Sequence, residues 1–170
     1  MTRIETERLV LRAPLAEDSA ALVGFFASER AAFVGGPLAL GLAWRHVATI
    51  CGHWMLKGFG PFILTDRHTG ESLGLTGPWA PGDRPEPEVV WALWDHAPKG
   101  QGLAQEGAQA ALDHLFTGLR WESVVCYIDP SNAPSIALAR RLGGVEDPHA
   151  ARPAPTDLVF RHAPNSGARP

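Results

Sequence analysis

The chain has 170 residues, of which 45% are hydrophobic, and it carries a formal net charge of −3 at pH 7. This length suits one domain with a proper core, and we predict that residues 1–162 form that domain. The negative charge and the lack of a long basic run argue against a nucleic-acid partner and against a membrane-surface patch, because both depend on clustered lysines and arginines.

The N-terminal segment "MTRIETERLVLRAP" contains charged residues where a secretory signal needs an apolar core, and no apolar run approaches the length of a membrane span. Cys51 and Cys126 lie in apolar segments without CxxC spacing, which favours buried, reduced thiols over a disulfide or a metal site. The seven histidines show no zinc-binding spacing, so we expect no metal. We expect a cytoplasmic protein, either a monomer or a homodimer.

The first half of the sequence contains both strand and helix periodicities. Residues 8–12 alternate polar and apolar side chains, as a half-buried strand does. Apolar side chains recur at helical spacing in residues 18–29 and 43–57. Residues 62–65 and 72–76 flank a turn and therefore predict a β-hairpin.

A proline-rich segment at residues 78–88 follows the hairpin and is predicted to be a loop that cannot belong to a central strand. Residues 88–94 are then apolar almost throughout, as in a strand covered on both faces. The remaining elements are a helix at 103–116, a strand at 123–128, a short helix ending at Gly143, a strand at 157–161 and a disordered tail at 163–170. This succession predicts an α+β domain with a mixed sheet.

The stretch "WDHAPKGQGLAQEG", residues 94–107, joins the apolar strand to a helix through Gly100 and Gly102. Glycines at such a junction let backbone N–H groups approach a ligand, and the helix start favours an anion, although the same glycines could simply make a tight turn. A P-loop needs Lys and Ser or Thr after its last glycine, and Leu103 stands there instead. The dinucleotide fingerprint needs a small residue where Gln105 stands.

The chain resembles the GNAT superfamily of acetyl-CoA-dependent N-acetyltransferases, in the branch similar to RimJ and RimL. The segments that carry the resemblance are, in chain order, "TERLVLRAP", "GHWMLKGFGPFIL", "EPEVVWALWDHAPKGQGLAQEGAQAALDHLF", "DPSNAPSIALARRLGG" and "LVFRH". The family motif of Gln or Arg, two residues, Gly, one residue, and Gly or Ala falls on Lys99, Gly102 and Ala104, with lysine as a departure. Gly144 replaces the usual phenylalanine after Leu-Gly, which we expect to remove apolar packing.

The resemblance implies a GNAT fold, with a mixed, mostly antiparallel sheet of about six to seven strands flanked by about four helices. It implies acetyl transfer from acetyl-CoA to a primary amine, either a protein N-terminus or a small molecule, by direct transfer in a ternary complex. The residues expected to bind the cofactor are Leu93, Trp94, Lys99, Gly100, Gln101, Gly102, Leu103, Ala104, Asn132 and Ser135.

The resemblance places a general base at Glu88, where the alternative is a solvated edge carboxylate, and Glu86 is the second candidate. An amine with a pKa near 10.4 needs such a base at neutral pH. The tyrosine that often protonates the leaving thiol is replaced by Ala139, whereas Ser135 occupies the position of a serine in RimJ-like sequences. Ser135 could serve as that acid or satisfy a backbone group in the first helical turn. Asn132 is expected to contact the pantetheine arm.

Other aromatic residues could border the acceptor pocket. His53, Trp54 and Trp79 are the candidates, although plain packing explains each of them as well. The alternative to an enzyme is a catalytically silent acetyl-CoA-binding or CoA-binding module for sensing or assembly. A nucleotide-binding phosphotransferase is a third hypothesis, and it would require ATP to compete with CoA.

Overall fold

The computed structural model describes residues 2–164, and its centre is one eight-stranded sheet in the order β1-β2-β3-β4-β5-β6-β8-β7. All neighbouring strands are antiparallel except β5 and β6, which are parallel. The strands are β1 (Arg3–Glu5), β2 (Leu9–Arg12), β3 (Phe62–Asp66), β4 (Ser72–Trp79), β5 (Glu88–Leu93), β6 (Val124–Ile128), β7 (Val145–Glu146) and β8 (Leu158–His162).

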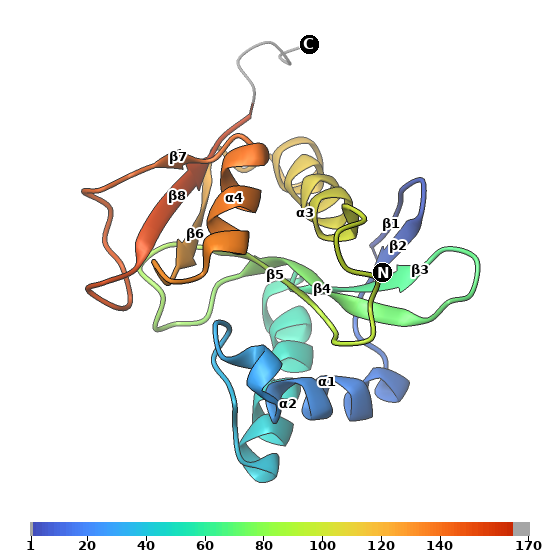
Figure 1. Ribbon diagram of the computed structural model, residues 1–170. Coiled ribbons are helices and arrows are strands. Elements are labelled where there is room, and N and C mark those ends of the chain that lie inside the picture. The colour runs from blue at the N-terminus through green and yellow to red at the C-terminus, as the bar shows by residue number, and fades with distance from the viewer. Residues whose placement is uncertain (1, 165–170) are drawn as a thin grey trace.

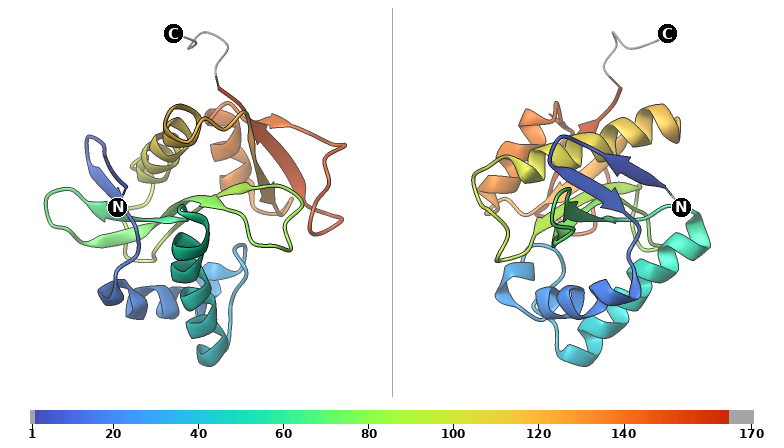
Figure 2. Two further views of the ribbon diagram at one scale, coloured as in Figure 1. Left: turned by 180° about the vertical axis from the view of Figure 1, so that it is seen from behind. Right: turned by 90° about the vertical axis from the view of Figure 1, so that its right-hand side faces the viewer.

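Four α-helices cover the two faces of the sheet in pairs. They are α1 (Ser19–Phe26), α2 (Leu40–Lys57), α3 (Leu103–Asp113) and α4 (Ala133–Arg141), with short helical turns at Ala16–Asp18, Glu29–Ala31 and His114–Gly118. Helices α1 and α2 lie on one face, and α3 and α4 lie side by side on the other (Figures 1 and 2). Within residues 2–164, no helix is both long and apolar enough to cross a membrane.

The α+β GNAT architecture predicted from the sequence is confirmed, with eight strands in place of six to seven. The additional strands, β1 and β7, have three and two residues and lie at the two edges of the sheet. Most of the tail predicted at residues 163–170 lies outside the described residues.

The prediction that Pro78 and Trp79 belong to a loop is wrong, because both residues continue β4 and pair with β5. Pro78 is opposite Val89, whereas β3 ends opposite Thr76. At Pro78, strand β4 therefore has a neighbouring strand, β5, on one side only. Proline has no N–H to donate, and on the other side there is no strand that could accept a bond from it.

Helix α3 packs closely on the sheet because small residues face it. Ala108 and Ala111 are fully buried, and a Cβ added to Gly107 would lie 2.6 Å from Leu64 Cδ2. The contact with Leu64 helps to hold α3 close against the sheet, where the helix lies mainly over β4 and β5.

Gly144 leaves room for a neighbouring ring. A Cβ at this position would lie 2.7 Å from Cε1 of His162, whose ring is 2% exposed. His162 thus fills the space beside Gly144. Its Nε2 lies 3.6 Å from the Cys126 sulfur, and burial lowers the pKa of His162 and raises the pKa of Cys126.

Candidate active site

Strands β5 and β6 meet at one residue pair and then separate. Glu88 is opposite Val125, and no further pair joins the two strands among the described residues. Trp94 N–H donates to the carbonyl oxygen of Leu73, in β4, at 2.8 Å. Because alternate residues of an antiparallel strand face the same neighbour, the N–H of Leu93 points away from β4, toward the side on which β6 has separated.

The glycine turn between β5 and α3 exposes backbone donors. Gly100 and Gly102 have φ of +72° and +78°, in the left-handed region that glycine adopts without strain. Gly102 is the N-cap of α3 and provides no side-chain cap, and the first amide with a carbonyl partner in the helix is that of Glu106, at 2.9 Å from Gly102 O. The amides of Leu103 and Ala104 therefore remain available to an anion.

Arg8 fixes the outer side of this turn. Its Nη1 donates to Gln101 O at 2.8 Å, and its Nε donates to Glu106 Oε2 at 2.7 Å. These bonds join the residue before β2 to the first turn of α3 and hold the Gln101 carbonyl on the Arg8 side. Sequence reasoning missed this contact, since the ion pair joins positions 98 residues apart.

A groove of about 680 Å³ runs from the glycine turn to α4. Its lining includes Leu93, the turn and first helical residues Gly100, Gly102, Leu103 and Ala104, the α4 residues Asn132 and Ser135, and the cations Arg30 and Arg141. Three residues predicted to bind the cofactor are absent from this lining: Lys99, whose Nζ pairs with Asp95 at 2.9 Å, Gln101, and the buried Trp94.

The two arginines of the groove were not predicted as site residues. Arg30 Nε donates to Leu93 O at 3.3 Å, which brings the loop after α1 to the edge of β5. Arg141 lines the groove, whereas its neighbour Arg140 lies over the Phe160 ring at 5.7 Å. Arginine forks bind phosphate well, so both groove arginines suit an anionic ligand.

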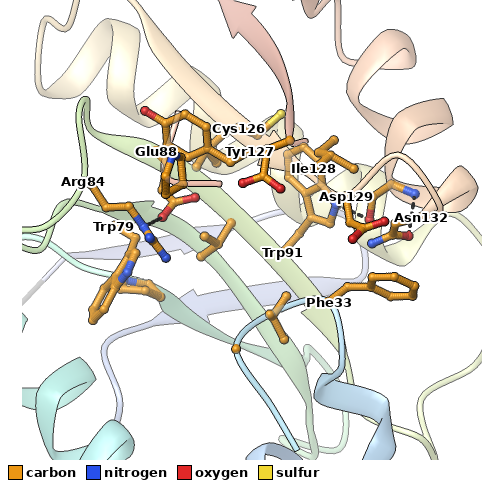
Figure 3. Close-up of a pocket in the computed structure, with 18 of the residues that line it drawn as sticks. Phe33, Trp79, Arg84, Glu88, Trp91, Cys126, Tyr127, Ile128, Asp129 and Asn132 are labelled. Atoms are coloured by element: carbon orange, nitrogen blue, oxygen red, sulfur yellow. Dashed lines mark hydrogen bonds and ion pairs between the residues drawn. The ribbon is translucent and has the colours of Figure 1, made fainter. Parts of the chain in front are cut away.

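A second cavity, of about 450 Å³, adjoins the groove and shares Trp91, Asn132 and Ser135 with it. Glu88 lies in its wall and is 5% exposed (Figure 3). Glu88 Oε1 accepts from Arg84 Nε at 2.6 Å, while Oε2 has no hydrogen-bond partner among residues 2–164. Burial raises the pKa of Glu88, and Arg84 opposes that rise. A carboxylate with a raised pKa and one free oxygen can accept a proton.

Glu86 lies outside this cavity. Its two oxygens accept from Arg161 at 2.8 and 2.9 Å, and this pairing keeps the pKa of Glu86 low. The two candidate glutamates therefore differ: both oxygens of Glu86 are bonded to Arg161, whereas one oxygen of Glu88 is free.

Asn132 and Ser135 meet at the start of α4, between the groove and the cavity. Asn132 is the N-cap, and its Oδ1 accepts from Ser135 N–H at 3.3 Å, which leaves its amide N–H groups for another partner. Ser135 Oγ lies 3.3 Å from Nε1 of Trp91. Because an indole only donates, Ser135 Oγ accepts this bond and its own hydroxyl hydrogen is free to donate.

Of the three aromatic candidates, Trp79 alone lines the cavity. His53 is buried behind it, with Nδ1 2.7 Å from Phe59 O and Nε2 accepting from Ala80 N–H, so both ring nitrogens are engaged. Trp54 donates to a backbone carbonyl at 2.9 Å and packs elsewhere. His53 and Trp54 are therefore packing residues, as the alternative interpretation held.

Two further residues line the cavity without having been predicted. His46 packs against Phe26 at 4.4 Å, and burial lowers the pKa of His46, with a smaller effect from Arg84. Tyr127 contributes its ring, but its hydroxyl oxygen is buried and lacks a hydrogen-bond partner among the described residues. Within residues 2–164, no group of three or more His, Cys, Asp or Glu side chains is arranged to hold a metal ion.

A sheet opened between two parallel strands, with an anion-binding turn at one end of the gap, is the architecture of a CoA-dependent acetyltransferase. Residues 8–145 match the acetyltransferase (GNAT) domain family, and the chain belongs to this family, whose acetyl donor is acetyl-CoA.

Solved structures agree with this assignment. The chain is similar to an acetyltransferase from Agrobacterium tumefaciens strain C58, with 36% identity, coverage of 95% of this chain and 94% of the other, and a TM-score of 0.90. It shares its fold with a RimL ribosomal L7/L12 α-N-protein acetyltransferase in complex with coenzyme A, at 17% identity, 95% and 98% coverage and a TM-score of 0.73.

A further relative is YkkB of Bacillus subtilis strain 168, with 34% identity over 91 residues. The match covers 51% of this chain and spans about half, 52%, of YkkB.

Proposed function

We propose that the chain is an acetyl-CoA-dependent N-acetyltransferase that transfers the acetyl group directly to a primary amine in a ternary complex. The observation that carries this proposal is the position of Glu88. A buried carboxylate with one free oxygen lies in a cavity that adjoins, through Trp91, Asn132 and Ser135, the groove of the glycine turn.

In this proposal acetyl-CoA supplies an activated thioester, and the groove binds it. The free amides of Gly100, Gly102 and the first turn of α3 hold the pyrophosphate, with Arg30 and Arg141 as further phosphate ligands. The amide groups of Asn132 bind the pantetheine arm.

Leu93 N–H is the donor that we assign to the thioester carbonyl oxygen. It points away from β4, whereas Trp94 N–H is already bonded to Leu73. A backbone N–H held by the sheet stabilises negative charge on that oxygen without rearrangement, as oxyanion-hole donors do.

Glu88 Oε2 acts as the general base. The acceptor amine arrives as an ammonium ion and gives a proton to Oε2, directly or through water. The nitrogen then forms a C–N bond with the acetyl carbon, the C–S bond breaks, and the electron pair leaves with the sulfur. The second proton that the nitrogen loses on becoming an amide passes to Ser135 Oγ as that hydroxyl protonates the thiolate, so the serine ends neutral. Arg84 keeps Glu88 ionised often enough to serve, since burial alone would raise its pKa further.

Ser135 gives the proton that the leaving thiolate needs. Trp91 Nε1 occupies one acceptor position of Ser135 Oγ, so the hydroxyl hydrogen is directed elsewhere. We assign Trp91 the part of a positioning residue, because it acts only through Ser135. No cysteine acts in this scheme: Cys126 is buried, and burial raises the pKa of its thiol.

The test compares two glutamates that differ by two positions. With acetyl-CoA and a panel of amines and peptides, release of free CoA is followed with a thiol reagent for wild type, Glu88→Gln and Glu86→Gln. We expect Glu88→Gln to lower kcat by about 10²-fold or more with unchanged acetyl-CoA affinity, and Glu86→Gln to keep its turnover. Unchanged turnover in Glu88→Gln contradicts its role. Acetyl-CoA binding without turnover on any acceptor would instead support the silent binding module.

A further inference from the structure

Aromatic rings form much of the wall of the Glu88 cavity. Phe26, Phe33, Trp79, Trp91 and Tyr127 all line it, and Figure 3 shows Phe33 across the pocket from Glu88, near Asn132. A volume of about 450 Å³ lies within the range of small-molecule sites, about 300–1,000 Å³. Rings also attract a cation through their faces. The walls therefore suit a compact ligand with an apolar body and a positive charge.

The charged side chains of the cavity are mainly acidic. Glu88, Asp129 and Asp157 line it, and Arg84 is the one Lys or Arg side chain in that lining among the described residues. Arg84 already pairs with Glu88 at 2.6 Å. Asp129 accepts from the Ser131 hydroxyl and amide, which keep its pKa low. The lining thus carries three carboxylates against one guanidinium, whose Nε is already bonded to Glu88, so the cavity is acidic on balance.

We propose that the acceptor is a small primary amine with an aromatic or branched aliphatic body and no carboxylate beside the amine. This inference rests on the proposed function and names its substrate class. Glu88 is 5% exposed and keeps one oxygen, Oε2, free for the ammonium group, and Asp157, directly before β8, adds a second negative charge to the same lining. The α-carboxylate of a free amino acid would meet these acids in a site of reduced dielectric, where like charges repel strongly.

A peptide N-terminus fits this cavity less well. Its amine is followed by an amide whose N–H and C=O need partners when they leave water. The Tyr127 hydroxyl is buried and Trp91 Nε1 is bonded to Ser135. Asn132 and Ser135 also line the cavity, but the proposed function assigns them to the pantetheine arm and the leaving thiolate, so none of these four groups is assigned to a peptide. Rings offer contact area without such pairing.

The test uses acceptors that differ by one carboxylate. Phenethylamine, tryptamine and isoamylamine are paired with phenylalanine, tryptophan and leucine, and each amino acid is also supplied as the first residue of a tripeptide. Free CoA release gives kcat/KM for every acceptor. We expect at least one amine to exceed its amino acid and its peptide by tenfold or more. Asp157→Asn should reduce that ratio, whereas the control Asp113→Asn, on the exposed side of α3, should leave it unchanged.

Binding of the same amines to the CoA-loaded protein, measured by calorimetry, separates the two levels of the proposal. Turnover in which no amine exceeds both its amino acid and its peptide by tenfold overturns the substrate class and leaves the acetyltransferase in place. Amine binding without CoA release from any acceptor overturns the acetyltransferase and retains the amine site. If acetyl-CoA binds but the amines are neither bound nor acetylated, the amine site is overturned as well.

Discussion

Gly102 offers a quantitative test of the glycine turn, because its backbone has φ +78°. A left-handed backbone costs an ordinary residue about 1–2 kcal/mol, and a β-branched residue adopts it least readily. An added Cβ at Gly102 approaches only Arg8 Nη2, at 3.7 Å, so the protein itself has room for a side chain. Gly70, in the turn between β3 and β4, is a matched control with φ +75° and no atom within 4 Å of an added Cβ.

Gly102→Val and Gly70→Val should therefore lose similar stability, about 1–2 kcal/mol, or about 2–8 °C in Tm for a chain of this size. Only Gly102→Val should weaken acetyl-CoA binding. To the extent that the turn relaxes in the free variant, part of this cost is moved from stability to binding, where restoring the left-handed backbone costs up to about 1–2 kcal/mol, or up to about 5–30-fold in Kd. The isopropyl group also takes space in the groove.

Thermal unfolding and titration calorimetry with acetyl-CoA measure the two quantities on the same samples. Equal Kd values for wild type and Gly102→Val would refute the assignment of the pyrophosphate to this turn. Equal weakening in both variants would show that the loss of affinity reflects general destabilisation.

Three further predictions concern the cavity and the residues around it. Arg84→Gln should move the acid limb of the kcat/KM profile to higher pH, because Glu88 must lose its proton to act and its raised pKa rises further without the guanidinium; a limb at lower pH would contradict the pairing. Because the pKa of Glu88 is raised in the folded protein, the free energy of unfolding should fall as pH rises through that pKa. Glu88→Gln lacks the titrating group, so urea titrations should show a free energy of unfolding that depends less on pH than in wild type. Ser135→Ala should lower kcat by about 10²-fold with little change in KM for acetyl-CoA, and Trp91→Phe should act in the same direction with a smaller effect; a change in KM alone would point to binding instead.

Local patterns in the sequence predicted most of the helices and strands, but not where each one ends and not the short strands at the edges of the sheet. Residues 103–116 were expected to form one helix, and the α-helical part ends at Asp113 before a wider turn at His114–Gly118. Strands β1 and β7 were missed because two or three residues are too few to show a period of two. Pro78 was assigned to a loop because the absence of a second neighbouring strand cannot be known before the sheet is assembled.

For the site, the residues of the glycine turn and the resemblance to a family predicted a cofactor-binding groove and a catalytic carboxylate, Glu88. Arg84, Trp91 and Arg30 were missed, because each acts through a contact that only the folded chain creates. Trp91 meets Ser135 across 44 positions of sequence, and Arg30 meets Leu93 across 63. Lys99 fits the motif by position, yet its ammonium group pairs with Asp95 at the surface. A sequence motif predicts the position of the backbone in the turn, whereas the direction of a side chain depends on tertiary packing.

Direct transfer in a ternary complex is tested most directly by initial rates over a grid of acetyl-CoA and amine concentrations, with the mass of the protein and of the product recorded. We expect intersecting reciprocal plots, an N-acetylated amine, and a protein that gains no acetyl group. Parallel plots with an acetylated protein, or no CoA release with any amine, would contradict the proposed function.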